Sequence, residues 1–174
     1  MLTAGAETPA REEAVMRHLI SCLALILALA GAAAAQSVSS LDADEIEQAL
    51  IEAGYSPDMS VSAIQGRPAA RIEAGNFFFF VQGRDCEDER CHGLLLFANF
   101  DLGREVQERD FEVMNAWNDQ RLRGRAFVLE PANAIGLDNF IDLRGGVDRE
   151  HVLYALGKFP TLLDEFVTFF ADNY

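Results

Sequence analysis

Two unbroken apolar runs separated by a short acidic segment constrain the fold of this chain more than any other feature. The runs occupy residues 77–81 and 94–97, and the acidic segment occupies residues 83–90. Short apolar runs that are rich in aromatic and branched residues are typical of β-strands. The pattern predicts a hairpin whose two strands are covered on both faces or contribute to an interface, because one-sided strands usually alternate apolar and polar residues.

Cys86 and Cys91 stand at the neck of this hairpin, and Cys22 lies in an apolar segment near the N-terminus. If Cys22 is removed by cleavage, an even pair remains in an oxidising compartment, which predicts a structural disulfide. The closed loop is so short that it contributes only about 2–3 kcal/mol through loop-closure entropy, so the bond would fix the hairpin locally. A metal site and a redox pair are the alternatives, although a redox pair usually has the tighter CxxC spacing.

The N-terminal segment has the features of a secretory signal peptide. Arg17 precedes an apolar run at residues 19–35, which ends in small residues that fit an A-x-A cleavage site near Ala35. Met16 is the expected start, because the acidic, alanine-rich stretch before it is unlike a basic n-region. A retained membrane anchor and lipidation at Cys22 are the alternatives. We therefore expect a periplasmic or secreted protein with export of the Gram-negative type.

Cleavage would separate residues 1–35, the N-terminal extension and signal peptide, from a single domain at residues 36–174. The 139 residues that remain suffice for one core but not for two. Cleavage removes three of 28 acidic and two of 14 basic residues, which leaves 25 acidic residues, 12 basic residues and a net charge of −13. This charge argues against nucleic acid and anionic lipid as partners. No integral membrane span is expected after cleavage.

The apolar periodicity predicts an α+β domain, an antiparallel sheet packed with helices in the order α-β-β-β-β-α-β-β-α. Asp42 and Glu45 are placed for a capping box at the start of the first helix. Pro160 predicts a break or kink between residues 157 and 161, because proline removes a backbone donor and its ring clashes with the preceding turn. Helices are expected at residues 41–54, 107–120 and from 148 onward, and strands at 59–64, 69–74, 77–82, 94–100, 126–130 and 135–143.

Arg121, Arg123 and Arg125 recur at every second position just before a predicted strand. In an extended chain this spacing places all three guanidinium groups on one side, where they could bind an anionic ligand or an acidic peptide. The alternative is that they neutralise neighbouring carboxylates in a very acidic protein. Trp117, in the preceding helix, is either a core anchor or a platform for the same ligand.

No motif in the sequence predicts catalysis, a metal site or a cofactor. The serines lack a G-x-S-x-G context, and His92 and His151 have no nucleophile signature beside them. Spatial neighbours could still assemble a site from distant segments. The carboxylates at positions 85, 87, 88 and 89 could attract a divalent cation, but their spacing matches no calcium loop and is typical of a solvated hairpin tip.

The order of several short motifs resembles the YbjN domain family, whose members are described as bacterial sensory transduction regulators. The similarity extends from about residue 41 to residue 170. It implies a fold similar to type III secretion chaperones, which are small, acidic and non-enzymatic and commonly pair with another copy or a client. The motifs are Gly54-Tyr55, the phenylalanine-rich run 77–80, the cysteine pair, Phe97-Ala98-Asn99-Phe100-Asp101, Asn115-Ala116-Trp117-Asn118 and Arg123-Gly124-Arg125-Ala126.

The leading hypothesis is an exported, non-enzymatic protein-interaction domain, either a sensory transduction regulator or a chaperone-like module. Phe78 and Phe80 are candidate partner contacts, because their strand has more apolar residues than a one-sided sheet needs. The expected partner is a protein, and a homodimer is one form that this could take. The alternative is a periplasmic sensor or enzyme for a small anionic ligand. The residues that this alternative would use are Arg121, Arg123, Arg125 and Trp117.

Overall fold

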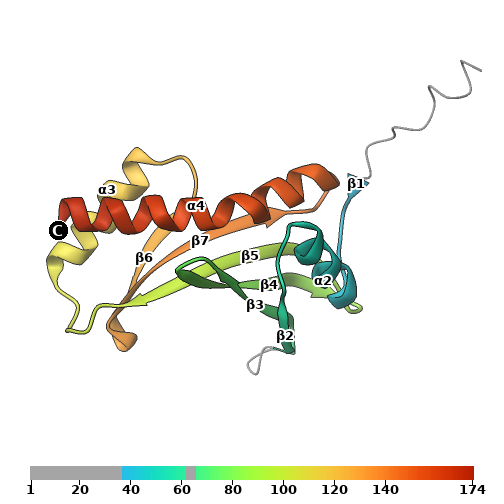
Figure 1. Cartoon of the computed structure of the whole chain (residues 1–174), viewed down its shortest axis with the longest axis horizontal. Helices are drawn as coiled ribbons and strands as arrows, with labels where there is room; N and C mark the ends of the chain where they lie inside the picture. The colour runs from blue at the N-terminus through green and yellow to red at the C-terminus, as the bar shows by residue number, and fades with distance from the viewer. Residues whose placement is uncertain (1–36, 62–65) are drawn as a thin grey trace, which may run out of the picture. The chain divides into compact units, whose positions relative to one another are not determined.

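The computed structural model describes residues 37–61 and 66–174 (Figure 1). The predicted signal peptide and residues 62–65, at the end of the first predicted strand, lie outside the described residues. Within the described ranges, no helix is long and apolar enough to cross a bilayer. Contacts within Gln36–Tyr174 make this part of the chain one compact unit.

The described residues form three α-helices and a six-stranded antiparallel sheet, which confirms the α+β prediction and the order of the main elements. Two short strands that the sequence did not predict, β1 (Ser37–Val38) and β8 (Val147–Asp148), pair with each other. The helices are α2 (Ala43–Glu52), α3 (Glu108–Gln120) and α4 (Arg149–Asn173), with a single 3-10 turn η1 (Glu130–Ala132). In spatial order the sheet contains β2 (Asp58–Val61), β3 (Pro68–Ala74), β4 (Phe77–Glu87), β5 (Arg90–Asp101), β7 (Ala134–Asp142) and β6 (Arg125–Leu129).

The central hairpin of β4 and β5 is longer than the sequence predicted. The acidic segment at residues 83–90 belongs mostly to the strands, so its prediction as a loop was wrong. Only Asp88 and Glu89 connect the strands, and both have positive φ values, 47° and 66°. Two-residue connections of this kind match the right-handed twist of the flanking strands, so cross-strand pairing can extend to the turn despite the polar sequence.

The start of α2 confirms the predicted capping box. The Asp42 carboxylate accepts a hydrogen bond from the backbone N–H of Glu45 at 2.9 Å, and the Glu45 carboxylate accepts one from the N–H of Asp42 at 3.0 Å. Two N–H groups at the helix end, where no intrahelical acceptor exists, are thereby satisfied. The local sequence therefore specifies this helix boundary.

The long helix α4 continues without interruption through Pro160, so the predicted break is wrong and only the alternative, a kink, stays a prediction. Pro160 cannot donate to the carbonyl of Leu156, which lies one turn earlier. The hydroxyl of Tyr55 donates to that carbonyl instead, at 3.1 Å. Both halves of the helix pack on the core, because buried side chains occur on both sides of the proline.

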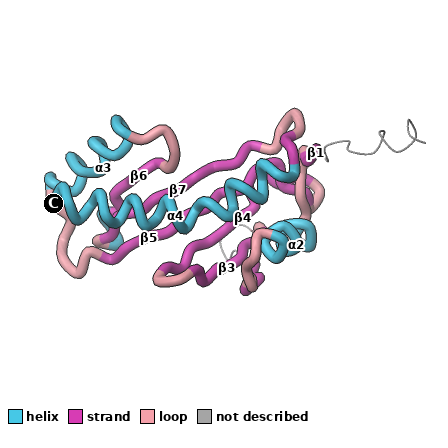
Figure 2. Tube along the Cα trace, turned by 45° about the horizontal axis from the view of Figure 1, so that its top comes forward, coloured by secondary structure: helices cyan, strands magenta, loops and turns pink. Residues whose placement is uncertain are grey.

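One face of the sheet is covered by helices, and all three helices contribute to the same core. Figure 2 shows α4 lying along the sheet, with α2 near one end and α3 near the other. Strand residues that point toward the helices are buried, among them Phe79, Val81 and Leu96. Residues at alternating positions point to the opposite face. No helix of the described ranges packs on that second face, where Phe78 is 49% exposed.

Candidate functional site

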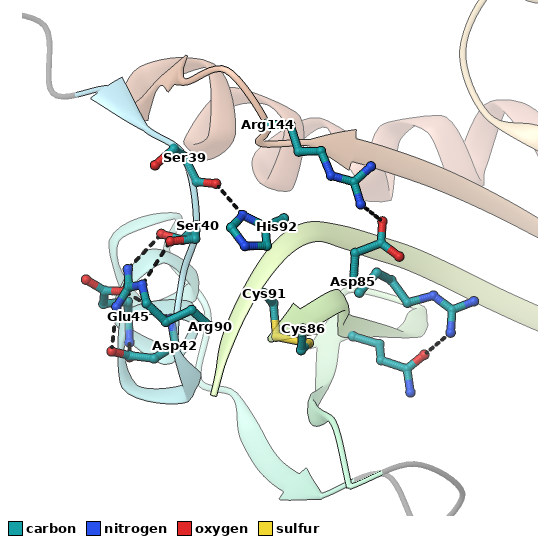
Figure 3. The surroundings of a disulfide bond; sticks show 12 residues. Ser39, Ser40, Asp42, Glu45, Asp85, Cys86, Arg90, Cys91, His92 and Arg144 are labelled. Carbon is teal, nitrogen blue, oxygen red and sulfur yellow. Dashed lines mark hydrogen bonds and ion pairs between the residues drawn. A yellow bond between two sulfur atoms is a disulfide. The ribbon is translucent and has the colours of Figure 1, made fainter. Parts of the chain in front are cut away.

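The disulfide between Cys86 and Cys91 joins the two strands of the central hairpin and confirms the predicted pairing (Figure 3). The two cysteines are direct register partners, and their Cα atoms lie 3.8 Å apart. Cys91 is completely buried. Its backbone also pairs with Leu41 through two hydrogen bonds of 2.7 and 2.9 Å. The disulfide therefore lies where the hairpin meets the segment that leads into α2.

Arg90 ties the hairpin end to the capping box of α2 (Figure 3). Its guanidinium donates to the Ser40 hydroxyl at 2.8 Å and to the Ser40 carbonyl at 2.9 Å. It also donates to the carboxylates of Asp42 and Glu45, at 3.2 and 2.7 Å. On the other side of the hairpin, Arg144 forms an ion pair with Asp85 at 2.9 Å. Arg144 thus neutralises one carboxylate of the hairpin end, whereas Arg90 of the hairpin neutralises carboxylates of the α2 cap.

The uncovered face of the sheet carries a group of aromatic and aliphatic side chains, which we call the open face. The rings of Phe78 and Phe80 meet edge to face at 6.1 Å, and those of Phe80 and Phe97 stack at 5.3 Å. The guanidinium of Arg71 lies over the Phe78 ring at 4.8 Å. Phe140 is 47% exposed. By strand register and alternation, the open face comprises Arg71, Phe78, Phe80, Leu95, Phe97 and Phe140.

The strand register also places six residues in one row across the open face. At one end of the row, the Arg125 guanidinium forms an ion pair with the Asp138 carboxylate, with the Nε atom 3.2 Å from an Oδ atom. This contact raises the pKa of Arg125 above its usual value. Asp138 is 7% exposed, although no helix of the described ranges covers this face. From β2 to β6, the row reads Asp58, Arg71, Phe80, Phe97, Asp138 and Arg125.

A cleft of about 650 Å³ lies beside the sheet at the start of β6, where part of β7 has no neighbouring strand. Strand β6 pairs with β7 only at residues 134–138, so residues 139–142 have no strand partner on that side within the described ranges. The connection between α3 and β6 and one side of α4 complete the walls. Basic lining residues are Arg121, Arg123, His151 and Lys158; acidic ones are Asp142 and Glu165; apolar ones include Leu122, Phe140, Tyr154 and Leu162.

The structure separates the three arginines that the sequence places in an alternating pattern. Residues 121–124 form no strand, so the extended conformation needed for a single-sided arrangement is absent. Arg121 and Arg123 line the cleft. Arg125 begins β6 and pairs with Asp138 on the open face. Neutralisation of a neighbouring carboxylate therefore describes Arg125 and not the other two.

Trp117 lies in the core with no exposed side-chain area. Its indole N–H donates to the carbonyl of Gly124 at 2.9 Å, which fixes the connection between α3 and β6. The Arg121 guanidinium lies 5.4 Å from the centre of its ring. Trp117 therefore supports the wall of the cleft from inside the core, as expected of a core anchor.

A second ion pair with a buried carboxylate holds the start of α3. The guanidinium of Arg104 donates two hydrogen bonds of 2.8 Å to the carboxylate of Asp110, which is completely buried. The Asp110 carboxylate also accepts a bond from the backbone N–H of Gln107. The bond from Arg104 is the largest cause that lowers the pKa of Asp110, and it outweighs the opposing effect of burial. This pair fixes the start of α3, and neither residue is among those that line the cleft.

Metal-binding and catalytic groups are not brought together in the part of the chain that the structure describes. No group of three or more histidine, cysteine or acidic side chains is placed to hold a metal ion there. Every buried side-chain nitrogen and oxygen among the described residues has a hydrogen-bond partner. The described residues instead offer two surfaces suited to binding a partner or ligand: the apolar open face and, beside it, a cleft with several basic side chains.

Sequence reasoning missed several residues of these two surfaces. The alternation of β5 could have placed Phe97 beside Phe80, had the strand register been known. Lys158, the single lysine of the chain, was not singled out, because α4 reads as a covering helix. Tyr154 and Asp138 were missed as well, since their neighbours come from distant segments.

The fold, the disulfide and the open face together define a disulfide-linked α+β domain with an uncovered aromatic sheet face. The chain belongs to the YbjN family, whose model matches residues 42–172 and is described as "Putative bacterial sensory transduction regulator". This match confirms the resemblance seen in the sequence. No curated protein and no solved structure matches the chain.

Proposed function

We propose that this chain is an exported, non-enzymatic regulatory domain that acts through protein interaction, and that a second copy of the chain covers its open face. The family description supports a regulatory or interaction role. The observation that carries the proposal is the row of paired charges and aromatic rings across the open face. Two exposed phenylalanines, Phe78 and Phe140, extend the apolar surface on either side of this row.

The charges in the row are antisymmetric about its centre. Read from β2, the row is negative, positive, two phenylalanines, negative, positive; read from β6, every charge has the opposite sign. A two-fold axis parallel to the strands between β4 and β5 would therefore bring opposite charges together. Asp58 of one copy would face Arg125 of the other, and Arg71 would face Asp138. Phe80 would face Phe97 in the middle.

This self-complementarity favours a second copy over a different protein as the occupant. Two-fold interfaces use the same patch on both subunits, so each residue contact must occur twice. Complementary charges at the rim fix the register of such an interface, and the apolar centre supplies most of the affinity. The net charge of −13 on residues 36–174 opposes association over long range, so dimerisation should strengthen as salt is added.

Export is supported by the chemistry of the hairpin. A disulfide between paired strands is the kind of bond that persists in secreted and periplasmic proteins. The non-enzymatic part of the proposal is supported by the family description.

The test measures the mass of residues 36–174 in solution by light scattering, from micromolar to millimolar concentration. We expect a dimer that dissociates on dilution. Phe78→Asp should raise the dimer dissociation constant at least about tenfold, because it places a charge on the apolar surface that the second copy would cover. Phe111→Asp is the matched control, since Phe111 is 39% exposed on α3, away from the open face. A monomer at every concentration would exclude the second copy as occupant.

A further inference from the structure

We propose that the cleft between α4, the end of β7 and residues 121–124 binds a small organic anion with two or more carboxylate or phosphate groups. This inference does not rest on the proposed dimer, because Arg123 and Lys158 line the cleft and do not belong to the row of the open face. It rests on where the basic side chains of a very acidic protein are placed.

Most arginines of the described ranges are neutralised by carboxylates of the chain. Ion pairs within 4.0 Å involve Arg71, Arg90, Arg104, Arg109, Arg125, Arg144 and Arg149. Among the described residues, the arginine and lysine side chains outside such pairs are Arg67, Arg84, Arg121, Arg123 and Lys158. Three of these five line the same cleft. In a chain with 28 acidic residues, this gathering of unpaired cations marks a place for an external anion.

The contacts of Arg121 and Arg123 leave most of their donors free. Arg121 is held by the rings of Trp117 and Phe169, at 5.4 and 6.0 Å, rather than by an acceptor. Arg123 makes one long hydrogen bond, 3.4 Å, to the hydroxyl of Tyr154. A guanidinium has five N–H donors in a fixed fork that matches a carboxylate or phosphate. Both arginines are thus positioned by aromatic rings and remain available to an oxyanion.

The electrostatics at Tyr154 agree with this placement. Its pKa is lowered, first by the hydrogen bond from Arg123 and further by the charges of Arg123 and Lys158. A phenol that loses its proton more readily reports a positive local potential. Asp142 and Glu165 also line the cleft, but neither forms an ion pair with its cations among the described residues.

The shape and walls of the cleft indicate the size and polarity of the ligand. Its volume of about 650 Å³ lies within the range typical of small-molecule sites. Leu122 projects fully into solvent, as an apolar residue that a bound ligand would cover. Basic groups stand on two different elements, with the arginines on the connection before β6 and Lys158 on α4. A ligand with oxyanion groups at both ends and a short carbon frame fits this arrangement.

Isothermal titration calorimetry of residues 36–174 with citrate and with pyrophosphate, at constant ionic strength, tests the proposal. We expect saturable binding of at least one probe, and the stronger of the two identifies carboxylate or phosphate as the preferred group. Arg123→Glu and Lys158→Glu should each raise the dissociation constant at least about tenfold. The matched control is Arg67→Glu, which changes the net charge equally but lies outside the cleft.

Circular dichroism establishes that each variant is folded, and Arg123→Gln replaces Arg123→Glu if the charge reversal prevents folding. Absence of saturable binding of both probes, or equal weakening by Arg67→Glu, would overturn the proposal. Binding of an acidic peptide without binding of either small probe would overturn it too. Light scattering on the same variants separates this outcome from failure of the dimer, because Arg123 and Lys158 lie outside the open face.

Discussion

The hydroxyl of Tyr55 donates a hydrogen bond to the carbonyl of Leu156 at 3.1 Å, at the turn of α4 where Pro160 has no N–H to offer. The two residues are 101 positions apart in the chain. Their contact joins the end of α2 to the middle of α4 and satisfies a backbone acceptor that the proline would otherwise leave unpaired. The Tyr55 ring also packs edge to face against Phe79 at 5.7 Å. This contact explains how a proline is accommodated within a continuous helix.

Tyr55→Phe should lower the free energy of unfolding by about 1–2 kcal/mol at neutral pH, because the Leu156 carbonyl loses its donor. Urea unfolding followed by circular dichroism measures the change. Tyr154→Phe is the control, since the hydroxyl of Tyr154 contacts only a surface arginine. An unchanged midpoint for Tyr55→Phe would contradict the role of this bond.

The same pair predicts a dependence on alkaline pH. Burial raises the pKa of Tyr55 above 10.0 in the folded protein, so the folded state resists deprotonation of this group. Its contribution to stability is complete below pH 10 and is lost as the pH rises through the raised folded value. The difference in unfolding free energy between the wild type and Tyr55→Phe should therefore shrink in strongly alkaline solution. A difference that grows with pH would contradict this assignment.

Asp110→Asn should lower the free energy of unfolding by about 2–3 kcal/mol. This loss is smaller than the loss expected on breaking a fully buried ion pair, because Arg104 is partly exposed. The lowered pKa of Asp110 means that its contribution is present above pH 3.8 and is lost as the pH falls through the folded value. The difference in unfolding free energy between Asp110→Asn and the wild type should thus shrink in strong acid. Asp119→Asn, an exposed change on the same helix, serves as the control in acid titrations of stability.

Glu89→Gly should stabilise the domain by about 0.5–1 kcal/mol. Glu89 has a φ of 66°, a backbone conformation that is unfavourable for glutamate and that glycine adopts readily. The disulfide beside the turn holds this conformation in place. Gln48→Gly, in the exposed part of α2, should instead destabilise by about 1 kcal/mol. Thermal unfolding of both variants measures the two effects, and a destabilised Glu89→Gly would contradict the account of the turn.

Local sequence signals predicted what local physics determines. The capping box of Asp42 and Glu45 involves residues only three apart, so its pattern is visible in the sequence. The disulfide followed from an even cysteine pair within a hairpin. The strand extension to Glu87 was missed, because cross-strand pairing and the disulfide outweigh the polar character of the segment.

Features that depend on distant segments could not be predicted from the sequence. Pro160 on its own predicts a break or kink, and the contact with Tyr55 and the core packing of both helix halves come from distant segments. The cleft combines Arg123 with Lys158, which lie on separate elements and share no sequence pattern. The charge order of the open face depends on strand order, because β7 lies between β5 and β6.

The most direct test of the central claim is an isotope-filtered nuclear Overhauser measurement on a mixture of labelled and unlabelled residues 36–174. The filter removes contacts within one copy, including the stacking of Phe80 on Phe97 at 5.3 Å. The proposed dimer predicts cross-peaks between the Phe80 ring of one copy and the Phe97 ring of the other. Their absence at concentrations where a dimer is present, or cross-peaks from Phe111 instead, would contradict pairing through the open face.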